Sequence, residues 1–307
     1  MKRKAQPLLS EDGQQAFDQY TQVLQCSEDL SPVTIRNYLS DLRQFMAWYE
    51  CSWYEVQEGH FFTPQAIAPS LLIRYRDHLQ TTFGLKPSTV NRTLMSLKRY
   101  FAWTRKTQIV QSDPASPIKF VPKEASPPRH LNEEEEDALV AAVNATGTLR
   151  DQAMITLLLH TGLRAQELCT LTRQQVHLGK RNGTLRIMGK RKKVREVPLN
   201  TTARSILNQY LETLQQECQY LFPSEKTHRA LTGRALGHLV TKYAAQAQVA
   251  DISPHDLRHR FGYRMAEVVP LHRLAQIMGH DSLDATMLYI PGTKQDLQQD
   301  VEKIAWI

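Results

Sequence analysis

A proline-rich segment in the middle of the chain, Ser112–Pro128, constrains the fold more than any other feature of the sequence. Its residues SDPASPIKFVPKEASPP include five prolines, each of which lacks a backbone donor and disfavours helix at the residue before it. A chain of 307 residues is also too long for one ordinary core. We therefore expect two domains, residues 10–112 and 131–307, joined by a linker over residues 113–130.

The composition is that of a globular protein with an anionic partner. Hydrophobic residues make up 41% and charged residues 22% of the chain, which is enough apolar material for cores and too little charge for disorder. No apolar run is long enough to span a bilayer and no secretion signal is visible, so we expect a cytoplasmic protein. The four cysteines are scattered without ligand spacing, so we expect no metal and no cofactor. The net charge of +7 permits a DNA partner without proving one.

The first domain is predicted to be small and all-helical. SPVTIRNYLSDLRQFMAWYE from Ser31 and KPSTVNRTLMSLKRYFAWTRK from Lys86 both open with a cap or turn signal, and both repeat apolar residues at helical spacing. Outside the apolar stripe of the second segment lie polar and basic residues that either contact DNA phosphates or form a solvated face. The candidates are Asn91, Arg92, Lys98, Arg99 and Arg105. In the linker, the basic residues Lys119, Lys123 and Arg129 leave the same two interpretations open.

The second domain is predicted to be larger and mainly helical, with a small antiparallel β-hairpin. Asn132 is a plausible N-cap for an acidic first turn, and a helix over Leu149–His160 is expected to end at Gly162, which can take the left-handed conformation. Two short strands, Leu185–Met188 and Val194–Leu199, flank a basic tip. Downstream, Ser253 and Pro254 form a cap and first-turn signal before HDLRHRFGYRMAE.

The second domain also contains residue types suited to breaking a phosphodiester without a metal. That reaction needs a nucleophile, a proton donor for the leaving oxygen, and donors on the non-bridging oxygens. Arginine suits the last role because its planar, permanently charged guanidinium engages two oxygens at once. We select Arg164, in HTGLRAQEL, and Arg258, in SPHDLRH. His255 stands three residues before Arg258, so both are expected on the same face of one helix.

Taken one at a time these motifs are common, but their order is not. HTGLRAQEL, a Gly-Lys hairpin ending VREVPL, SPHDLRH, IMGH and TMLYI follow one another, and this ordered set resembles the catalytic domain of the tyrosine recombinases, also called the phage integrase family. The resemblance is strong from Asn132 to the C-terminus. It is weaker over the helical N-terminal region, which resembles that family's core-binding, DNA-binding domain.

The resemblance implies a role for each matching residue. Arg164 and Arg258 match the two phosphate-clamping arginines, and Tyr289 matches the nucleophile. His255 matches a histidine in proton transfer with that nucleophile, and His280 matches a donor to the phosphate. Lys190 matches the lysine that protonates the leaving 5′ oxygen, and Glu167 matches an acidic residue that supports the basic ones.

Several of these assignments have structural or functional rivals. Arg191, Lys192 and Lys193 adjoin Lys190, and so basic a tip could simply grip the DNA backbone. His280 could make only a structural hydrogen bond. Tyr263, Tyr243 and Tyr220 are competing phenols that do not complete the motif. The sequence departs from the family at Arg191, where glycine is usual, at RFGYRM after the HxxRH motif, and at the loop Val268–Pro270; these departures concern loop geometry more than chemistry.

The resemblance implies a site-specific recombinase that cleaves and rejoins double-stranded DNA through a 3′-phosphotyrosyl intermediate. It implies four protomers on two sites, with a related recombinase or accessory protein left open as a partner, and a simple Xer-like system is favoured. The apolar C-terminal residues Ile304–Ile307 dock either on a neighbouring protomer or on their own domain. Two other functions remain open: a type IB topoisomerase that relaxes DNA, and a non-catalytic DNA-binding regulator on an integrase scaffold.

Overall fold

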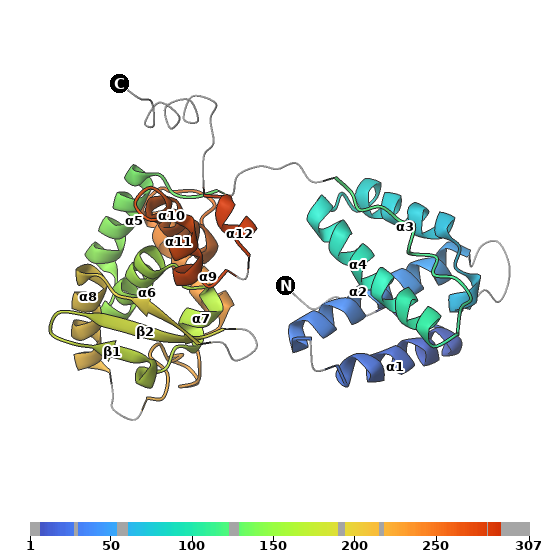
Figure 1. Cartoon of the computed structure of the whole chain (residues 1–307), viewed down its shortest axis with the longest axis horizontal. Helices are drawn as coiled ribbons and strands as arrows, with labels where there is room; N and C mark the ends of the chain where they lie inside the picture. The colour runs from blue at the N-terminus through green and yellow to red at the C-terminus, as the bar shows by residue number, and fades with distance from the viewer. Residues whose placement is uncertain are drawn as a thin grey trace, which may run out of the picture. The chain divides into compact units, whose positions relative to one another are not determined.

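A computed structural model describes most of the chain. It divides into two compact units, Met1–Ala125 and Ser126–Ile307, each treated by itself below (Figure 1). The described residues are 7–27, 30–53, 61–122, 129–189, 194–214, 218–280 and 282–289. They are mainly helical with one small antiparallel sheet, as the sequence predicted. Within these ranges, none of the helices combines the length and the apolar character that crossing a bilayer would require.

In the described residues of unit 1, four α-helices surround an aromatic core. They are α1 (Glu11–Gln25), α2 (Pro32–Trp53), α3 (Pro69–Thr81) and α4 (Pro87–Lys106), with a 3₁₀ turn, η1, at Pro64–Ala66. The two predicted apolar stripes lie on the buried faces of α2 and α4, and these two helices pack on each other. Phe45 of α2 lies 5.0 Å from Tyr75 of α3, and Tyr20 of α1 lies 5.1 Å from Tyr100 of α4, as ring centroids. Such edge-to-face pairs fix how the helices meet.

The first half of the proline-rich segment is attached to α4. The Asn91 side chain bonds both backbone groups of Val121, donating to its carbonyl at 2.8 Å and accepting from its amide at 2.8 Å. The Lys98 ammonium donates to the carbonyls of Ala115 and Ser116 at 2.6 and 3.0 Å. Residues 113–122, which were expected to belong to the linker, are therefore anchored on unit 1 through side chains of α4.

Unit 2 surrounds one buried helix, α6 (Leu149–Thr161). Around it lie α5 (Glu133–Thr146), α7 (Ala165–Thr170), α8 (Thr201–Thr213), α9 (Gly233–Gln246) and α10 (Pro254–Ala266); α11 (Leu271–Met278) and α12 (Asp284–Met287) follow, with a 3₁₀ turn, η2, at Arg173–Gln175 (Figure 1). The predicted ends hold: Asn132 makes a capping box with Glu135, and Gly162 takes a left-handed φ of 60°. A Cβ at Gly162 would overlap the Phe261 ring of α10, so the turn after α6 requires glycine on two counts.

The sheet has three antiparallel strands in the order β1 (Val176–Leu178), β2 (Gly183–Met188) and β3 (Val194–Pro198). The predicted hairpin is β2 with β3, in a register that pairs Leu185 with Val197 and Ile187 with Arg195. Leu185, Ile187 and Val197 are buried in the core of unit 2. The inner face of the sheet thus continues the hydrophobic core, and β3 also packs against α11.

Helix α10 is held to α5 by a pair of charged contacts. Glu136 of α5, which is itself buried, accepts from Arg260 Nε and from Arg264 Nη1, each at 2.6 Å. Two guanidinium groups one turn apart on α10 therefore share one carboxylate. This contact fixes the rotation of α10, the helix that carries His255 and Arg258.

Candidate active site

The turn after α6 places Arg164 beside two other elements. Arg164 is the N-cap residue of α7, and Glu167 accepts from its backbone amide at 2.8 Å and from its Nη1 at 3.0 Å. Its Nη2 donates to the carbonyl of Gly279, beyond the end of α11, at 2.7 Å. The Arg164 side chain is 44% exposed. One guanidinium therefore joins α7 to the C-terminus of α11 and still faces solvent.

Arg258, on α10, is buried, with 3% of its surface exposed. It donates to the carbonyl of Gly162, to that of Met278 at 3.0 Å, and to the Nε2 atom of His280 at 3.0 Å. Burial, and then the charge of Arg164, lowers the pKa of Arg258 to about 10. The guanidinium thus remains protonated at neutral pH.

The contacts of His280 define its tautomer. Because a guanidinium can only donate, the Nε2 atom of His280 accepts from Arg258, and its proton is on Nδ1, which donates to the Thr286 hydroxyl at 2.7 Å. Burial, followed by the charges of Arg258 and Arg164, lowers the pKa of His280 to about 4. The ring is therefore neutral at pH 7 and is directed by Arg258 on one side and by Thr286 on the other.

Tyr289 lies within the same group of residues and is buried, with 2% of its surface exposed. Its ring centroid is 6.3 Å from that of His280 and 5.2 Å from that of Tyr263, and the ring packs on the bare backbone of Gly262 in α10. Its hydroxyl is 3.0 Å from the Nδ1 atom of His259. Burial raises the pKa of Tyr289, and the nearby charge of Arg258 opposes this only in part.

Two residues at this site were missed by the sequence reasoning. His259, which bonds the Tyr289 hydroxyl, directly follows Arg258 and stands one turn after His255, so the spacing could have indicated it. Arg195, which binds Glu167, stands just beyond the basic tip of the hairpin. Because Arg195 comes just after a run of four basic residues, the sequence offered no sign that its partner would be a carboxylate.

The predicted site residues are only partly brought together by the described coordinates. Arg164, Arg258, His280, Tyr289 and their supporting Glu167 form one connected group, whereas the exposed His255 lies at its margin, with its ring centroid 4.3 Å from that of His259. Burial lowers the pKa of His255, and the charge of Arg258 adds to this effect. The predicted hairpin residues Lys190, Arg191, Lys192 and Lys193 lie outside the described residues.

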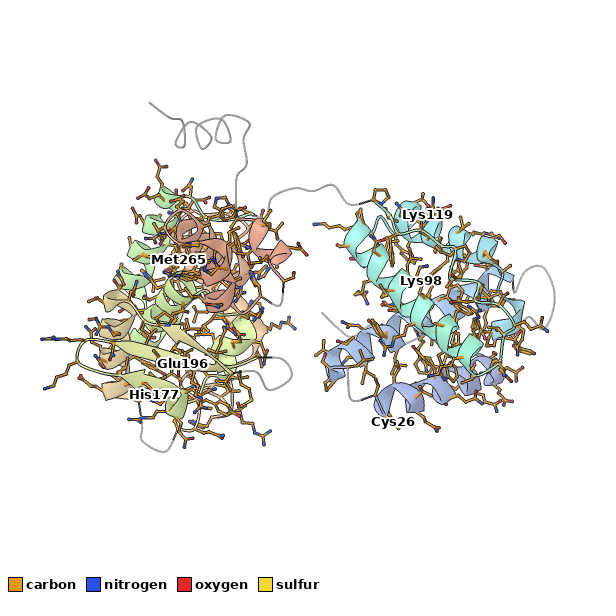
Figure 2. The ribbon with its side chains drawn as sticks, in the orientation of Figure 1. Cys26, Lys98, Lys119, His177, Glu196 and Met265 are labelled. Atoms are coloured by element: carbon orange, nitrogen blue, oxygen red, sulfur yellow. The ribbon has the colours of Figure 1, made fainter. Side chains whose placement is uncertain are left out.

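The basic residues predicted to bind DNA on α4 have partners within unit 1. Arg92 forms an ion pair with the buried Asp41. Lys98, labelled on α4 in Figure 2, donates to the carbonyls of residues 115 and 116. The guanidinium of Arg99 lies 5.9 Å from the ring centroid of Tyr38. Arg105 is exposed in the last turn of the helix. Their role as DNA contacts stays a prediction, and the structure gives three of them a structural partner.

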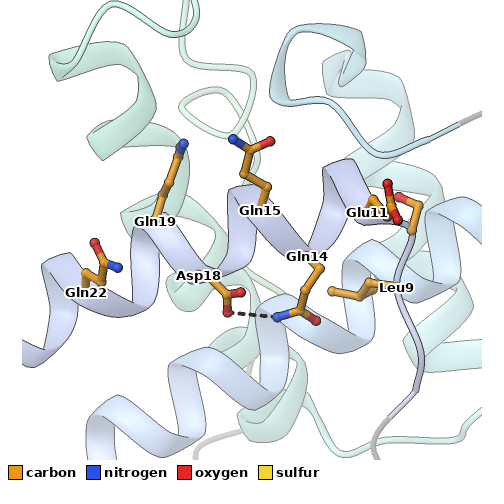
Figure 3. A pocket seen from close by; sticks show the side chains of 8 residues that line it. Leu9, Glu11, Gln14, Gln15, Asp18, Gln19 and Gln22 are labelled. Carbon is orange, nitrogen blue, oxygen red and sulfur yellow. Dashed lines mark hydrogen bonds between the residues drawn. The ribbon is translucent and has the colours of Figure 1, made fainter.

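An open hollow beside α1 in unit 1 offers no comparable chemistry. Its lining is mainly glutamines and acidic side chains, and Gln14 donates to Asp18, one turn further along α1, at 2.8 Å (Figure 3). The eight lining residues include no histidine, cysteine or basic side chain. The cluster around Tyr289 is therefore the better candidate for a reactive site.

Comparisons with known proteins identify the family of the chain. Residues 129–296 match the phage integrase family, and residues 17–108 match the phage integrase N-terminal SAM-like domain. The chain is 32% identical over 296 residues to tyrosine recombinase XerD of Pseudomonas putida, an alignment covering 92% of this chain and 94% of that protein. It is 30% identical to tyrosine recombinase XerC of Shewanella oneidensis, covering 89% and 87%.

Solved structures give the same fold. The XerH site-specific recombinase bound to its difH substrate, in a pre-cleavage complex, has a TM-score of 0.73 at 22% identity and covers 93% of this chain and 84% of its own. The Tn1549 transposon integrase with circular intermediate DNA has a TM-score of 0.74 at 17% identity, covering 95% and 99%. With the family match spanning more than half of the chain, the resemblance inferred from the ordered motifs is confirmed. The chain belongs to the phage integrase family of tyrosine recombinases.

Proposed function

We propose that this protein is a site-specific recombinase in which Tyr289 attacks a scissile phosphate of double-stranded DNA. Attack forms a 3′-phosphotyrosyl bond and releases a 5′ hydroxyl; attack by the 5′ hydroxyl of a partner strand then breaks that bond and restores the tyrosine. The energy of the phosphodiester is retained in the protein link, so neither ATP nor another cofactor is required. The observation that carries the proposal is the junction of Tyr289 with Arg164, Arg258 and His280, drawn from separate segments into one connected group.

Each side chain has a task that its surroundings suit. Arg164 and Arg258 clamp the non-bridging oxygens, and this electrostatic stabilisation is expected to contribute several kcal/mol, on the order of 3 per donor. His280 supports the clamp and donates to the phosphate once a protonated nitrogen is free to face it. Lys190 protonates the leaving 5′ oxygen, a role taken from the resemblance alone.

The proton of the Tyr289 hydroxyl has two candidate acceptors. His255 holds this role by resemblance, and His259 holds the hydroxyl at 3.0 Å in this structure. Burial, then the charges of His255 and Arg258 among others, lowers the pKa of His259 to about 4. A neutral imidazole is able to accept, but so low a pKa makes it a weak base for a phenol whose pKa is raised. We therefore assign His259 to holding the resting tyrosine and His255 to proton transfer.

The proposed partner is double-stranded DNA bound by both domains, residues 10–112 as the core-binding domain and residues 131–307 as the catalytic domain, with 113–130 as the linker. The net charge of +7 supports an anionic partner. Structural neighbours of the same fold were solved with DNA bound, among them the XerH recombinase and the Tn1549 integrase. We propose a tetramer on two sites. The C-terminal residues Ile304–Ile307, which are expected to dock on a neighbouring protomer or on their own domain, lie outside the described residues.

Covalent capture tests this function directly. The protein is incubated with genomic fragments, and DNA that stays attached after denaturation is sequenced, for the wild type and for Tyr289→Phe. The matched control is Tyr263→Phe, which removes a neighbouring phenol whose hydroxyl only donates to the carbonyl of Leu288 at 3.2 Å. We expect attached DNA with the wild type and the control, and none with Tyr289→Phe.

Other outcomes identify the rival functions. Relaxation of supercoiled plasmid without recombinant products indicates a type IB topoisomerase. Site-specific binding without any attached DNA, on a nicked duplex that traps cleavage, indicates a DNA-binding regulator. Either result contradicts the proposal.

A further inference from the structure

Arg195 of β3 makes three charge-assisted hydrogen bonds to two different elements. Its Nη1 and Nη2 donate to Oε1 and Oε2 of Glu167 on α7, each at 2.8 Å, in a two-pronged arrangement. Its Nε donates to the carbonyl of Ile277, in the last turn of α11, at 3.0 Å. The side chain is 14% exposed. All three types of guanidinium nitrogen are thus committed to protein partners in a nearly buried position.

The carboxylate that Arg195 binds is the same one that orients Arg164. Glu167 accepts four hydrogen bonds: two from Arg195, one from the Arg164 amide and one from its Nη1. A carboxylate has about four lone-pair sites, so this one is fully used. Burial alone would raise the pKa of Glu167, but the hydrogen bonds and charges of Arg195 and Arg164 outweigh it and lower the pKa. Glu167 is therefore ionised and fixed on both sides.

Arg195 also fills the space under the C-terminus of α11. Gly279 has a φ of 65°, and a Cβ on it would lie 2.7 Å from the Nη1 atom of Arg195. The carbonyls of this end would otherwise lack partners, and a cation suits the negative end of the helix. Three neighbouring carbonyls are taken by three arginines: Ile277 by Arg195, Met278 by Arg258 and Gly279 by Arg164.

We infer that Arg195 is a positioning residue for strand cleavage, acting through Glu167 on Arg164 and through the end of α11 on His280. This inference rests on the proposed function of the site. Each guanidinium nitrogen of Arg195 donates to a protein partner in the described structure, and the side chain is nearly buried. We therefore assign it to holding these two residues rather than to contacting DNA. Because it belongs to the strand that begins at Val194, it also joins the hairpin strand to the phosphate clamp.

Lysine cannot replace this geometry. An ammonium is a compact point charge, whereas the bonds here run from a planar fork to two oxygens on one side and to a backbone carbonyl on another. Arg195→Lys keeps the charge but loses at least one of the hydrogen bonds to Glu167 and Ile277. Glu167 and the end of α11 are then less firmly held, and Arg164 loses the fixed partner that aims it.

The test compares Arg195→Lys with Arg186→Lys, a matched change at an exposed arginine on the neighbouring strand β2, opposite Glu196 in the register. Single-turnover cleavage is measured on a nicked synthetic duplex carrying the sequence recovered by covalent capture. We expect Arg195→Lys to cleave about 10- to 100-fold more slowly, as when a supporting hydrogen-bond partner is lost. Its affinity for the duplex should remain within about twofold, and Arg186→Lys should match the wild type.

A second substrate separates positioning from a general structural defect. A methylphosphonate at the scissile position removes the negative charge that the arginine clamp stabilises. If Arg195 acts by aiming Arg164, the loss caused by Arg195→Lys must be several-fold smaller on this substrate than on the natural phosphodiester. An equal loss on both substrates, or no loss on either, overturns the inference.

Glu167→Gln provides an independent variant in case Arg195→Lys folds poorly, which thermal unfolding would reveal. It should reproduce the same dependence on the substrate, and combining the two changes should cost little more than the worse single change. Additive losses in the double variant would overturn the inference. Absence of covalent DNA with the wild-type protein is a different result, which contradicts the proposed function itself.

Discussion

His259 should make the stability of unit 2 depend on pH. The side chain is 8% exposed, and its Nδ1 atom contacts the Tyr289 hydroxyl. Its pKa is lowered from 6.5 to about 4, first by burial and then by His255, with Arg258 and His130 adding to the effect and Asp256 opposing it. The test lowers the pH from about 7.5 to about 5 and compares the wild type with His259→Gln. The amide of the variant still offers the Tyr289 hydroxyl a hydrogen-bond partner.

The sign follows from the depressed pKa. Between about pH 6.5 and pH 4 the unfolded chain binds a proton at this histidine and the folded chain does not, so stability falls as the pH falls through this range. The stabilisation is fully present above pH 6.5. At pH 5 a pKa of about 4 instead of 6.5 corresponds to a loss of about 2 kcal/mol. For a unit of this size that is roughly 4–8 °C in Tm.

Differential scanning calorimetry at the two pH values measures this effect, using the transition that belongs to unit 2. The other histidines with lowered pKa values, among them His160, His255 and His280, are present in both proteins. Since His259 is the smallest of the causes that lower the pKa of His280, their contributions nearly cancel in the comparison. The wild type should lose about 2 kcal/mol more than His259→Gln between pH 7.5 and pH 5. An identical pH dependence in the two proteins would show that His259 does not contribute to it.

Two further substitutions each test a contact, one in unit 2 and one in unit 1. Gly262→Ala puts a Cβ 2.6 Å from the Tyr289 ring, so the ring must leave its buried position, and nitration of Tyr289 mapped by mass spectrometry should become faster; an unchanged rate contradicts this. Arg92→Met leaves the carboxylate of Asp41 buried with one partner fewer and should cost unit 1 about 1–3 kcal/mol in urea unfolding. Arg105→Met, the exposed control on α4, should change stability by less than about 0.5 kcal/mol, and equal effects would dismiss the structural role of Arg92.

The features of the fold that the sequence predicted well are those with a local cause. The N-cap at Asn132 and the left-handed Gly162 each depend on residues within one turn, and the structure has both. The β2–β3 hairpin is also a local feature, because its two strands are neighbours in the sequence. Strand β1 was not predicted, because it is three residues long, and its pairing of Val176 with Leu185 depends on the sheet rather than on its own sequence.

The same distinction applies to the candidate site. The order of the motifs indicated Arg164, Arg258, His280 and Tyr289, and the structure brings them together. Arg195 was not indicated, since its partner Ile277 is 82 residues away and no spacing rule reaches that far. For basic residues on α4, the sequence shows only that they lie outside the apolar stripe. Partners elsewhere in unit 1 decide what such side chains bind, as the ion pair of Arg92 with Asp41, 51 residues away, illustrates.

The charges at the site support a phosphate as its natural occupant. Within the described part of unit 2, Arg164 and Arg195 bind one carboxylate, Glu167, while Arg258 donates to His280, whose low pKa keeps it neutral. The described group therefore has an excess of two positive charges, and burial, followed by the charge of Arg164, already lowers the pKa of Arg258. A phosphodiester brings one negative charge, and attack by a phenolate brings a second. The cluster is thus better matched to the transition state of the proposed reaction than to the bound DNA, which is the condition for catalysis rather than mere binding.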